Sequence, residues 1–554
     1  MRIEDKAYIA LGDRRLFLLP AMANRHGLIA GATGTGKTVT MKVIAESFSD
    51  MGVPVFFSDV KGDLSGTALP GVDTEDMRKR IERFGIADHF KYTGYPVRFW
   101  DIFGDEGIPL RVTVSDMGPQ LLSRLLNLTD VQAGVLNIVF KAADDQGLLL
   151  IDFKDLRAMV QFVGENRKEY TAEYGLVSTA SIGAIQRALL EFEDEGAEQL
   201  FGEAAFNIMD WIRTDCNGRG YINILNSRRL IASPKVYATF LLWMLTALFD
   251  KLPEVGDLDK PRIVFFFDEA HLLFNDAPRA LVQKIVQVVK LIRSKGVGVY
   301  FVTQSPGDIP DEVLAQLSNR IQHGLRAYTP SEQKNIRAAA RSFRANPAFD
   351  SEKALMGLGT GEALVSFLDR KGIPEVVEMA AILPPQSLMG PASPGEVRRI
   401  IELDELFAKY SEVIDRESAF EIINAAREEL RRLEAEETEN RLREKEEQKL
   451  QKQQEQQRLK EEKQAEKQAE RLAAKSAARN SAKDTVITKT ARQAAGNAAS
   501  SVARSVSTNL VNSLTGGKSA SAGTIAKRAA TSALSSVMRQ GASAIIRGLF
   551  GNKK

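Results

Sequence analysis

The chain has very little cysteine and histidine for its 554 residues. Its single thiol, Cys216, excludes an internal disulfide framework and is typical of proteins kept in a reducing compartment. The four histidines show no spacing typical of metal ligands, and the lone cysteine has no partner. Zinc sites and other transition-metal centres are therefore not expected.

Long apolar segments and an excess of one charge are also lacking. The strongest apolar run, ATFLLWMLTALF (238–249), is shorter than the ~20 residues that a helix needs to cross a bilayer, and predicts a buried helix. The first residues, MRIEDKAYIALGDRR, include acids and no long apolar core, which argues against a signal peptide. The 74 basic and 72 acidic side chains give a net charge of +2, so any nucleic-acid footprint must be local. We expect a cytoplasmic protein with no transmembrane segment.

The first 390 residues alternate short β-rich runs with helical patterns, which predicts an α/β fold with a parallel-rich sheet. Runs such as VFFF (264–267) are apolar at consecutive positions, as in strands buried on both faces. Between about 118 and 215, apolar residues recur at spacings of three and four, which predicts a helical insertion within this core. Strands are predicted at 27–31, 53–59, 95–101, 220–225, 262–269, 297–304, 320–328 and 361–369.

The rest of the chain predicts a helical C-terminal extension. A helical segment is expected at 391–435, followed at 436–480 by a charged helix or weak coiled coil. The sparse leucines of 436–480 do not keep a heptad spacing, so a solvated or loosely paired helix is favoured. Residues 481–554 form a basic tail rich in Ala and Ser whose end predicts an amphipathic helix. Such a helix can bind a membrane surface or an acidic partner, or dock on its own protein or a neighbouring copy.

The segment GATGTGKT (31–38) matches the pattern G-x-x-x-x-G-K-[ST], with a predicted strand before it and a helix after it. Its glycines let successive backbone N–H groups turn toward a phosphate, and the N-terminus of the following helix favours the same anion. Lys37 would reach the β- and γ-phosphates, and the Thr38 hydroxyl would bind Mg²⁺. The predicted nucleotide-binding residues are Gly31, Ala32, Thr33, Gly34, Thr35, Gly36, Lys37, Thr38 and Val39.

A second motif is RIVFFFDEAH (262–271), an apolar strand that ends in two acids. A P-loop site needs an acid at the tip of a neighbouring strand to hold Mg²⁺, and Asp268 fits this position. Glu269 follows directly and suits activation of a water for attack on the γ-phosphate, so it is the predicted catalytic base. Alternatively, the two carboxylates cap a helix N-terminus. His271 either couples hydrolysis to movement or caps a helix.

A third apolar strand, VGVYFVTQ (297–304), ends in Thr303 and Gln304. A glutamine beside the acid-bearing strand can hydrogen-bond the γ-phosphate or the attacking water, although a strand end facing solvent would look the same. Lys37, Glu269 and Gln304 are thus the predicted catalytic residues of the core. The sequence contains no NKxD element for guanine, so ATP is the expected nucleotide. The site requires these strand ends to lie at one edge of the sheet.

In this order, the motifs resemble the HerA/FtsK clade of P-loop ATPases. The likeness extends to DVKGDLSG (59–66), where HerA relatives carry an Asp-x-x-Gly-acid motif. It also extends to TQSPGDIPDEVLAQLSNRIQHGLR (303–326), which is similar to the last ATPase segment of HerA. The stretch LPEVGDLDKPRIVFFFDEAHLLF (252–274) and the IIRGLFG ending resemble a bacterial group of HerA-like proteins, the YjgR type.

The resemblance implies a RecA-like P-loop NTPase core in a homo-oligomeric ring, expected to be a hexamer, that hydrolyses ATP between subunits and translocates double-stranded DNA. It places Asp59 and Asp63 near the nucleotide. It also implies an arginine from the neighbouring subunit at the γ-phosphate, for which Arg320 and Arg326 are candidates, although either could be a surface arginine. The N-terminal β-barrel of HerA has no counterpart in the residues before the P-loop strand, which argues against its nuclease partnership.

Two functions of different classes follow. The leading one is an ATP-driven motor of the HerA/FtsK type acting on DNA, cytoplasmic or associated with the nucleoid. The alternative is an ATP-switched assembly or anchoring protein whose tail binds a membrane surface or a partner, because basic residues concentrate after residue 480. A third reading, a kinase for a small molecule, is disfavoured by the acid at Glu269.

Overall fold

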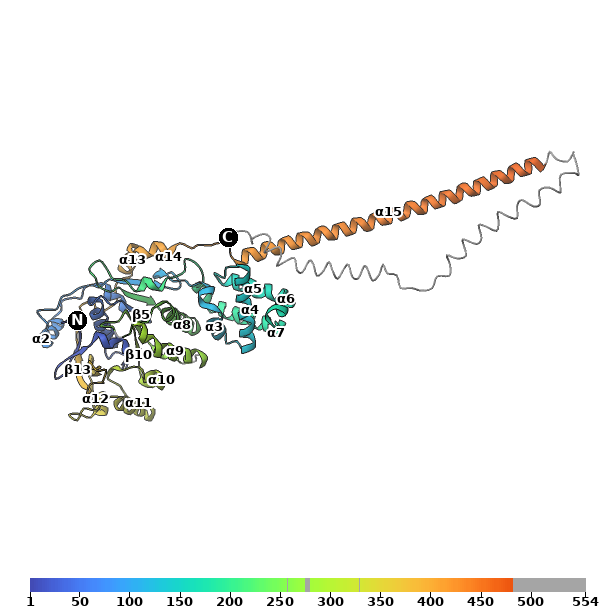
Figure 1. Ribbon diagram of the computed structural model, residues 1–554. Coiled ribbons are helices and arrows are strands. Elements are labelled where there is room, and N and C mark those ends of the chain that lie inside the picture. The colour runs from blue at the N-terminus through green and yellow to red at the C-terminus, as the bar shows by residue number, and fades with distance from the viewer. Residues whose placement is uncertain (257, 275–278, 328, 482–554) are drawn as a thin grey trace. The chain divides into compact units, whose positions relative to one another are not determined.

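The computed structural model describes residues 1–256, 258–274, 279–327 and 329–481 (Figure 1). The chain forms two compact units, Met1–Glu421 and Ile422–Lys554. The first unit is built on a thirteen-stranded sheet in the order β1-β2-β13-β12-β11-β4-β10-β9-β5-β8-β6-β7, with β3 paired to β2. Its strands are β1 Arg2–Ile3, β2 Lys6–Leu11, β3 Arg15–Leu18, β4 Gly27–Ala30, β5 Val55–Asp59, β6 Val97–Asp101, β7 Ile108–Pro109, β8 Ile222–Asn226, β9 Ile263–Phe267, β10 Val297–Thr303, β11 Asn319–His323, β12 Glu362–Ser366 and β13 Glu378–Ile382.

The centre of the sheet is parallel. Strands β11, β4, β10, β9, β5, β8 and β6 run in one direction, and β4, β5, β9 and β10 are buried at every position. The sequence IVFFF of β9 suits this place, because a strand covered on both faces needs apolar side chains at consecutive positions. All eight predicted strands are present, and the predicted α/β class with a parallel-rich sheet is confirmed.

One edge of the sheet is antiparallel, and the sequence pattern does not predict it. The pairs β11–β12, β12–β13, β13–β2 and β2–β3 are all antiparallel. They place Leu11 opposite Ala381, so a strand near the start of the chain pairs with a strand about 370 residues later in the sequence. Short strands of this kind depend on distant partners for their hydrogen bonds, and therefore leave little local signal.

The helices of the chain connect these strands or follow them. They are α1 Lys37–Asp50, α2 Glu75–Arg83, α3 Val114–Leu125, α4 Asp130–Gln146, α5 Phe153–Glu165, α6 Arg167–Tyr174, α7 Thr179–Asp194, α8 Pro234–Lys251, α9 Arg279–Ile292, α10 Asp311–Leu314, α11 Pro330–Arg341, α12 Ser351–Gly357, α13 Pro394–Leu403, α14 Glu405–Ser411 and α15 Ala419–Ser481. The expected apolar run lies in α8, where Phe240, Leu242 and Trp243 are buried. Among the described residues, no helix is long and apolar enough to span a membrane.

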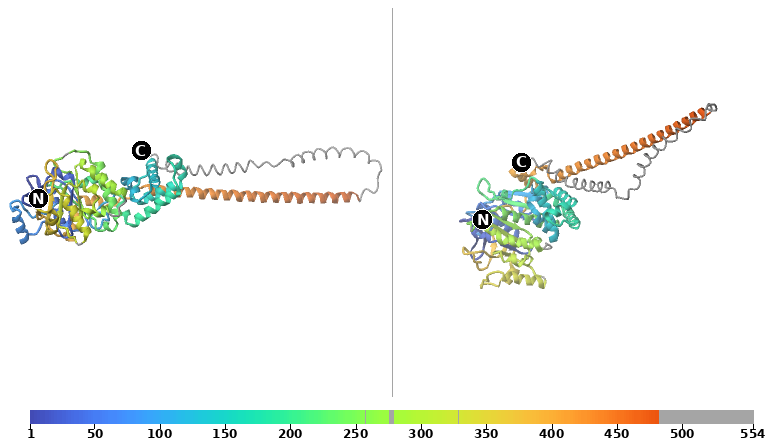
Figure 2. Two further views of the ribbon diagram at one scale, coloured as in Figure 1. Left: turned by 90° about the horizontal axis from the view of Figure 1, so that it is seen from below. Right: turned by 45° about the vertical axis from the view of Figure 1, so that its right-hand side comes forward.

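Helices α3 to α7 lie between β7 and β8 in the chain, where the helical insertion is predicted. Figure 2 shows them, in cyan to blue-green, as one group in both views. The group begins at Val114, earlier than predicted, because the Thr113 hydroxyl accepts a hydrogen bond from the backbone N–H of Asp116 and starts the helix there. The first helix bends at Gly118–Pro119, since Gly118 has a non-helical backbone.

A buried arginine ties the helical segment after residue 391 to the sheet. Arg98 of β6 is 1% exposed, and its guanidinium donates to Asp404 and Glu405 at 2.9 Å each. The guanidinium carbon also lies 3.8 Å from the ring centre of Tyr221. Because these contacts join α14 to the core, the first compact unit continues to Glu421.

We expect Arg98→Ala to lower the free energy of unfolding by about 3–5 kcal/mol, because the carboxylate of Asp404 would stay buried without a counter-charge. Denaturation in urea, followed by fluorescence, measures this loss. Arg398→Ala is the matched control, since its ion pair with Glu402 at 3.0 Å is exposed on both sides and should contribute less than about 1 kcal/mol. Equal losses in the two variants would contradict the anchoring role of Arg98.

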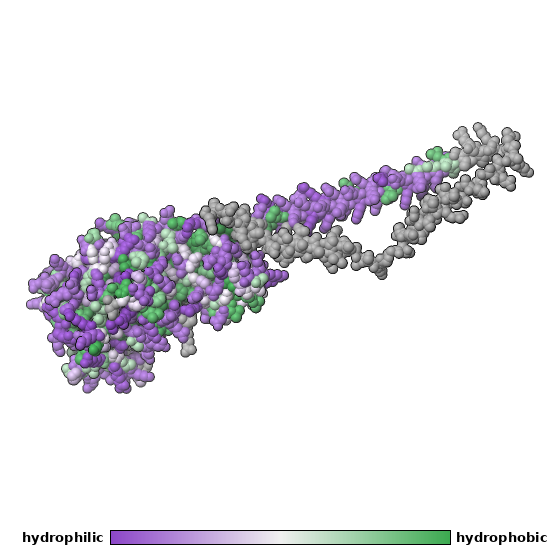
Figure 3. Space-filling view, viewed as in Figure 1, coloured by the Kyte–Doolittle hydropathy of each residue, from purple (hydrophilic) through white to green (hydrophobic). Residues whose placement is uncertain are grey.

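The second unit contains most of α15, which covers the segment where a charged helix is predicted. From 438 to 475 its side chains are exposed, including Leu442, Leu450, Leu459 and Leu472 at 49–68%. Figure 3 shows a largely hydrophilic surface along this helix. Ion pairs between residues four apart, such as Glu439–Arg443 at 2.7 Å, support a helix that is not packed into a core. The predicted basic tail lies outside the described residues from 482 onward.

Candidate active site

The carboxyl ends of four neighbouring strands meet at one edge of the parallel sheet. Strand β10 lies between β4 and β9, and β5 follows β9. The register pairs Ala30 with Thr303, and Phe267 with Phe301 and Ser58. The loops after these strands therefore start at the same level. The strand ends therefore share one edge, as expected. This arrangement brings together the predicted glycine loop, Gln304, Asp268, Glu269 and Asp59.

The glycine loop joins β4 to α1 and is fixed from behind by a buried histidine. Gly31 has φ +155°, and a Cβ there would stand 2.5 Å from the Cβ of His323. Gly36, at φ +114°, occupies the position before α1, and no side chain caps this helix start in the described structure. The first N–H groups of α1 thus face the loop and can bind an anion.

His323 supports this loop through two hydrogen bonds. Its Nε2 lies 2.8 Å from the hydroxyl of Thr40 in α1, and its Nδ1 lies 3.0 Å from the carbonyl oxygen of Glu362. Burial lowers the pKa of His323 to about 4, so the ring is neutral near pH 7. The histidine is therefore a structural support of the loop.

Lys37 is folded back against the loop that precedes it. Its ammonium group donates to the carbonyl oxygens of Gly31 at 2.6 Å and Ala32 at 3.1 Å. Burial lowers the pKa of Lys37, and the positive charge of Lys61 lowers it further. A triphosphate in the loop would replace the carbonyls with charged oxygens and so favour the protonated amine.

Oxygen donors suited to a divalent cation surround the start of α1. The Thr38 hydroxyl donates to Asp63 at 3.1 Å. Asp268 is 4% exposed, and burial followed by the charge of Glu269 raises its pKa to about 7. Burial also raises the pKa of Asp59 to about 6, although that carboxylate accepts from three backbone N–H groups of its own loop.

This donor set fits Mg²⁺, which prefers oxygen ligands. The buried negative charge of Asp268 is destabilised where it stands, so a divalent cation would relieve it. Within the described ranges, no group of three or more His, Cys, Asp or Glu side chains could hold a metal by itself. A cation that takes most of its ligands from phosphates and water matches such a site.

The carboxylate of Glu269 lies between three polar side chains. Its Oε1 is 2.8 Å from the ammonium nitrogen of Lys61, and its Oε2 is 3.3 Å from Nε2 of Gln304 and 3.4 Å from Nδ1 of His271. Burial alone would raise the pKa of Glu269, but the hydrogen bond and the charge of Lys61 outweigh it, so the pKa lies below its usual value. The surroundings thus shift the pKa values of the two adjacent acids in opposite directions, which favours different roles for Asp268 and Glu269.

The two candidate arginines lie in different surroundings. Arg320 pairs with Leu28 at the amino end of β4, away from the glycine loop, and its guanidinium donates to the carbonyls of Leu314, Leu317 and Ser342 at 2.9–3.1 Å. These contacts give Arg320 a structural role within its own chain. Arg326 is exposed and lines a cavity of about 490 Å³ together with Thr33 and Gln304. A role of either arginine toward a neighbouring subunit stays a prediction.

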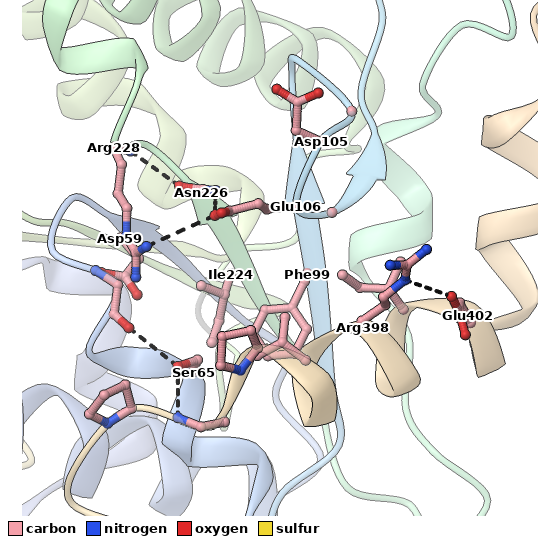
Figure 4. A pocket seen from close by; sticks show the side chains of 18 of the residues that line it. Asp59, Ser65, Phe99, Asp105, Glu106, Ile224, Asn226, Arg228, Arg398 and Glu402 are labelled. Carbon is pink, nitrogen blue, oxygen red and sulfur yellow. Dashed lines mark hydrogen bonds and ion pairs between the residues drawn. The ribbon is translucent and has the colours of Figure 1, made fainter.

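A second cavity, of about 510 Å³, borders the loop after β5 (Figure 4). Asp59 at the end of β5 and Ser65 after it line this cavity, and Phe99 and Ile224 line it from the strands β6 and β8. The same loop carries Lys61 and Asp63, which contact Glu269 and Thr38. The loop therefore lines this cavity and also contacts two residues of the candidate site.

Comparison with known proteins gives the family. The family described as "Helicase HerA-like C-terminal" matches residues 8–520. The chain belongs to this HerA-like family. Its glycine loop, acid pair and Gln304 all lie within the matched residues.

Two relatives of this HerA-like chain are named DNA double-strand break repair helicase HerA. The protein from Sulfolobus acidocaldarius is 22% identical over 349 residues, which are 62% of this chain and 62% of the relative. The protein from Sulfurisphaera tokodaii is 21% identical over 371 residues, which are 65% of this chain and 64% of the relative. The HerA-like chain thus spans less than two thirds of the length of these relatives.

Two solved structures of bacterial proteins are partly similar to this chain. The conjugative coupling protein TrwB has a TM-score of 0.48 at 14% identity, over 71% of this chain and 92% of that structure. VirB4 of Thermoanaerobacter pseudethanolicus has a TM-score of 0.42 at 14% identity, over 69% of this chain and 98% of that structure. The core of the HerA-like chain is of the RecA-like P-loop type, as predicted.

Sequence reasoning missed two residues of the HerA-like site. Lys61 lies within the motif DVKGDLSG, in which the family resemblance points only to the acids Asp59 and Asp63. A lysine between two acids directly after a buried strand was the available signal. His323 has no comparable signal, because its partners Thr40 and Glu362 are distant in the sequence.

Proposed function

We propose that this HerA-like protein binds and hydrolyses ATP and uses the energy to translocate or remodel double-stranded DNA. One observation carries the proposal: the glycine loop, Asp268, Glu269 and Gln304 converge at one edge of the parallel sheet. A phosphate-binding loop, a metal-binding acid and a buried base in one place are the parts that phosphoryl transfer to water requires. The names of the relatives support DNA as the substrate.

The residues have distinct roles in this proposal. The N–H groups of the loop and the ammonium of Lys37 bind the β- and γ-phosphates. Thr38 and Asp268 would hold Mg²⁺, which neutralises charge on the phosphates when it is bound. Glu269 takes a proton from the attacking water, and Gln304, which donates to Glu269 at 3.3 Å, keeps water and carboxylate oriented.

A ring of identical subunits, taken to be a hexamer, is part of the proposal. It would let an arginine of one subunit reach the γ-phosphate held by its neighbour. Arg326 is the better of the two candidates, because it is exposed and the guanidinium of Arg320 is engaged by three carbonyls of its own chain. The cytoplasmic location, and binding of the tail to a membrane or a partner in an ATP-switched assembly, stay predictions.

We expect duplex DNA to raise the ATPase rate of the full chain. The apparent DNA affinity should fall linearly with salt on logarithmic axes, by ~10³-fold between 50 and 200 mM if about six phosphates are contacted. Steady-state phosphate release with and without duplex DNA at several salt concentrations measures both effects. The Glu269→Gln variant supplies the background rate. A rate indifferent to DNA at every salt concentration would overturn the DNA substrate and leave ATP hydrolysis standing.

A further inference from the structure

Glu269 is held in an unusual backbone conformation. It has φ +48° and ψ +48°, the left-handed region that a residue with a side chain rarely adopts, and it is followed by a short helical turn at Ala270–Leu273. Such a conformation persists only where surrounding contacts stabilise it. The backbone conformation sets the direction of the Cα–Cβ bond of Glu269. The contacts of the carboxylate then determine where its two oxygens lie.

Lys61 makes the shortest of those contacts. Its ammonium lies 2.8 Å from Oε1 of Glu269, whereas Oε2 lies 3.3 Å from Nε2 of Gln304 and 3.4 Å from Nδ1 of His271. The side chain of Glu269 is 8% exposed and that of Lys61 is 40% exposed, so water screens this pair less than it screens a surface pair. The buried carboxylate of Asp268 directly precedes Glu269 and repels it. Without Lys61, the largest contribution that opposes this repulsion would be lost.

The position of Lys61 is itself fixed by its loop. The carboxylate of Asp59, at the end of β5, accepts from the backbone N–H groups of Lys61, Gly62 and Leu64 at 2.6–3.1 Å. Gly62 has φ +78°, and a Cβ there would stand 1.6 Å from the guanidinium of Arg228, which covers this turn. The positive φ favours glycine in this turn, which presents the lysine side chain in one direction.

We propose that Lys61 is a positioning residue for the catalytic base: it holds the carboxylate of Glu269 toward the attacking water through the ion pair at Oε1. This inference rests on the proposed ATP hydrolysis and adds a residue to it. Lys61 acts through Glu269 and binds no phosphate. Misplacing a catalytic group by about 1 Å can cost ~10²-fold in rate, so loss of the pair should appear in turnover and not in ATP binding.

The test uses the full chain with Lys61→Met and Lys61→Arg. We expect Lys61→Met to lower kcat by ~10–100-fold, with the KM for ATP and the Kd of a fluorescent ATP analogue nearly unchanged. Lys61→Arg should restore most of kcat, because a guanidinium can also pair with the carboxylate. Lys79→Met is the matched control. It removes an exposed ion pair in which Nζ of Lys79 lies 2.8 Å from Oε1 of Glu75. This variant should leave kcat unchanged.

A double variant separates positioning from direct phosphate contact. If Lys61 acts only through Glu269, Lys61→Met should change the residual single-turnover rate of Glu269→Gln very little, because the group it positions is already lost. Multiplying losses in the double variant, or a raised Kd for the ATP analogue in Lys61→Met, would overturn the inference, as would full kcat in Lys61→Met. A wild-type chain without ATP turnover would overturn the proposed function instead, and this inference with it.

Discussion

Glu269→Gln should lower the turnover of ATP by about 10²–10⁴-fold, the usual contribution of a general base. The substitution keeps the size of the side chain and its ability to accept a hydrogen bond from Lys61, but the amide cannot take a proton from water. ATP should still bind with nearly the same affinity, because the glycine loop and Lys37 are untouched. Phosphate release measures turnover, and a fluorescent ATP analogue measures binding.

A second acid serves as the control for this experiment. Glu312 pairs with Lys290 at 3.7 Å, and its side chain is 75% exposed, so Glu312→Gln should hydrolyse ATP at the wild-type rate. Wild-type turnover in Glu269→Gln would remove Glu269 as the base. Loss of ATP binding together with turnover would indicate that Glu269 maintains the site and does not act as the base.

Lys37→Met should weaken nucleotide binding strongly. Removing one partner of a buried, hydrogen-bonded charge pair costs about 2–5 kcal/mol, which corresponds to a Kd for ATP that is ~30-fold higher or more. Methionine fills most of the space of the buried lysine stem, so the chain should still fold. Turnover at subsaturating ATP should fall at least as much as the affinity. Titration with the fluorescent ATP analogue in the presence of Mg²⁺ measures the change.

Lys42→Met is the matched control on the same helix. Lys42 is also buried in α1, but its ammonium donates to the carbonyl of Leu388 at 2.7 Å and of Met389 at 3.3 Å. The variant should lose stability and keep ATP binding in the folded protein. Equal ATP affinity in Lys37→Met and the wild type would contradict the nucleotide site, and with it every function proposed for this edge of the sheet.

The parts of the site that could be predicted are those that one continuous segment encodes. A glycine loop between a strand and a helix, or two acids after five apolar residues, is a local pattern with a direct structural consequence. The same reasoning located buried central strands such as β9 and β10, because burial on both faces leaves a largely continuous apolar run. The antiparallel partners β2, β3 and β13 could not be found in this way, since β2 needs the distant strand β13 to complete its pairing.

The sequence by itself determined the class of the fold, the phosphate-binding loop and the identity of the acid pair. Local backbone preferences and apolar periodicity specify these features before any long-range contact forms. Only the tertiary structure decided that Lys61 meets Glu269, that His323 supports the loop behind Gly31, and that Arg320 is engaged by carbonyls of its own chain. Each of these depends on side chains from separate strands or loops that packing brings within hydrogen-bond distance, and no local pattern fixes which side chains will meet.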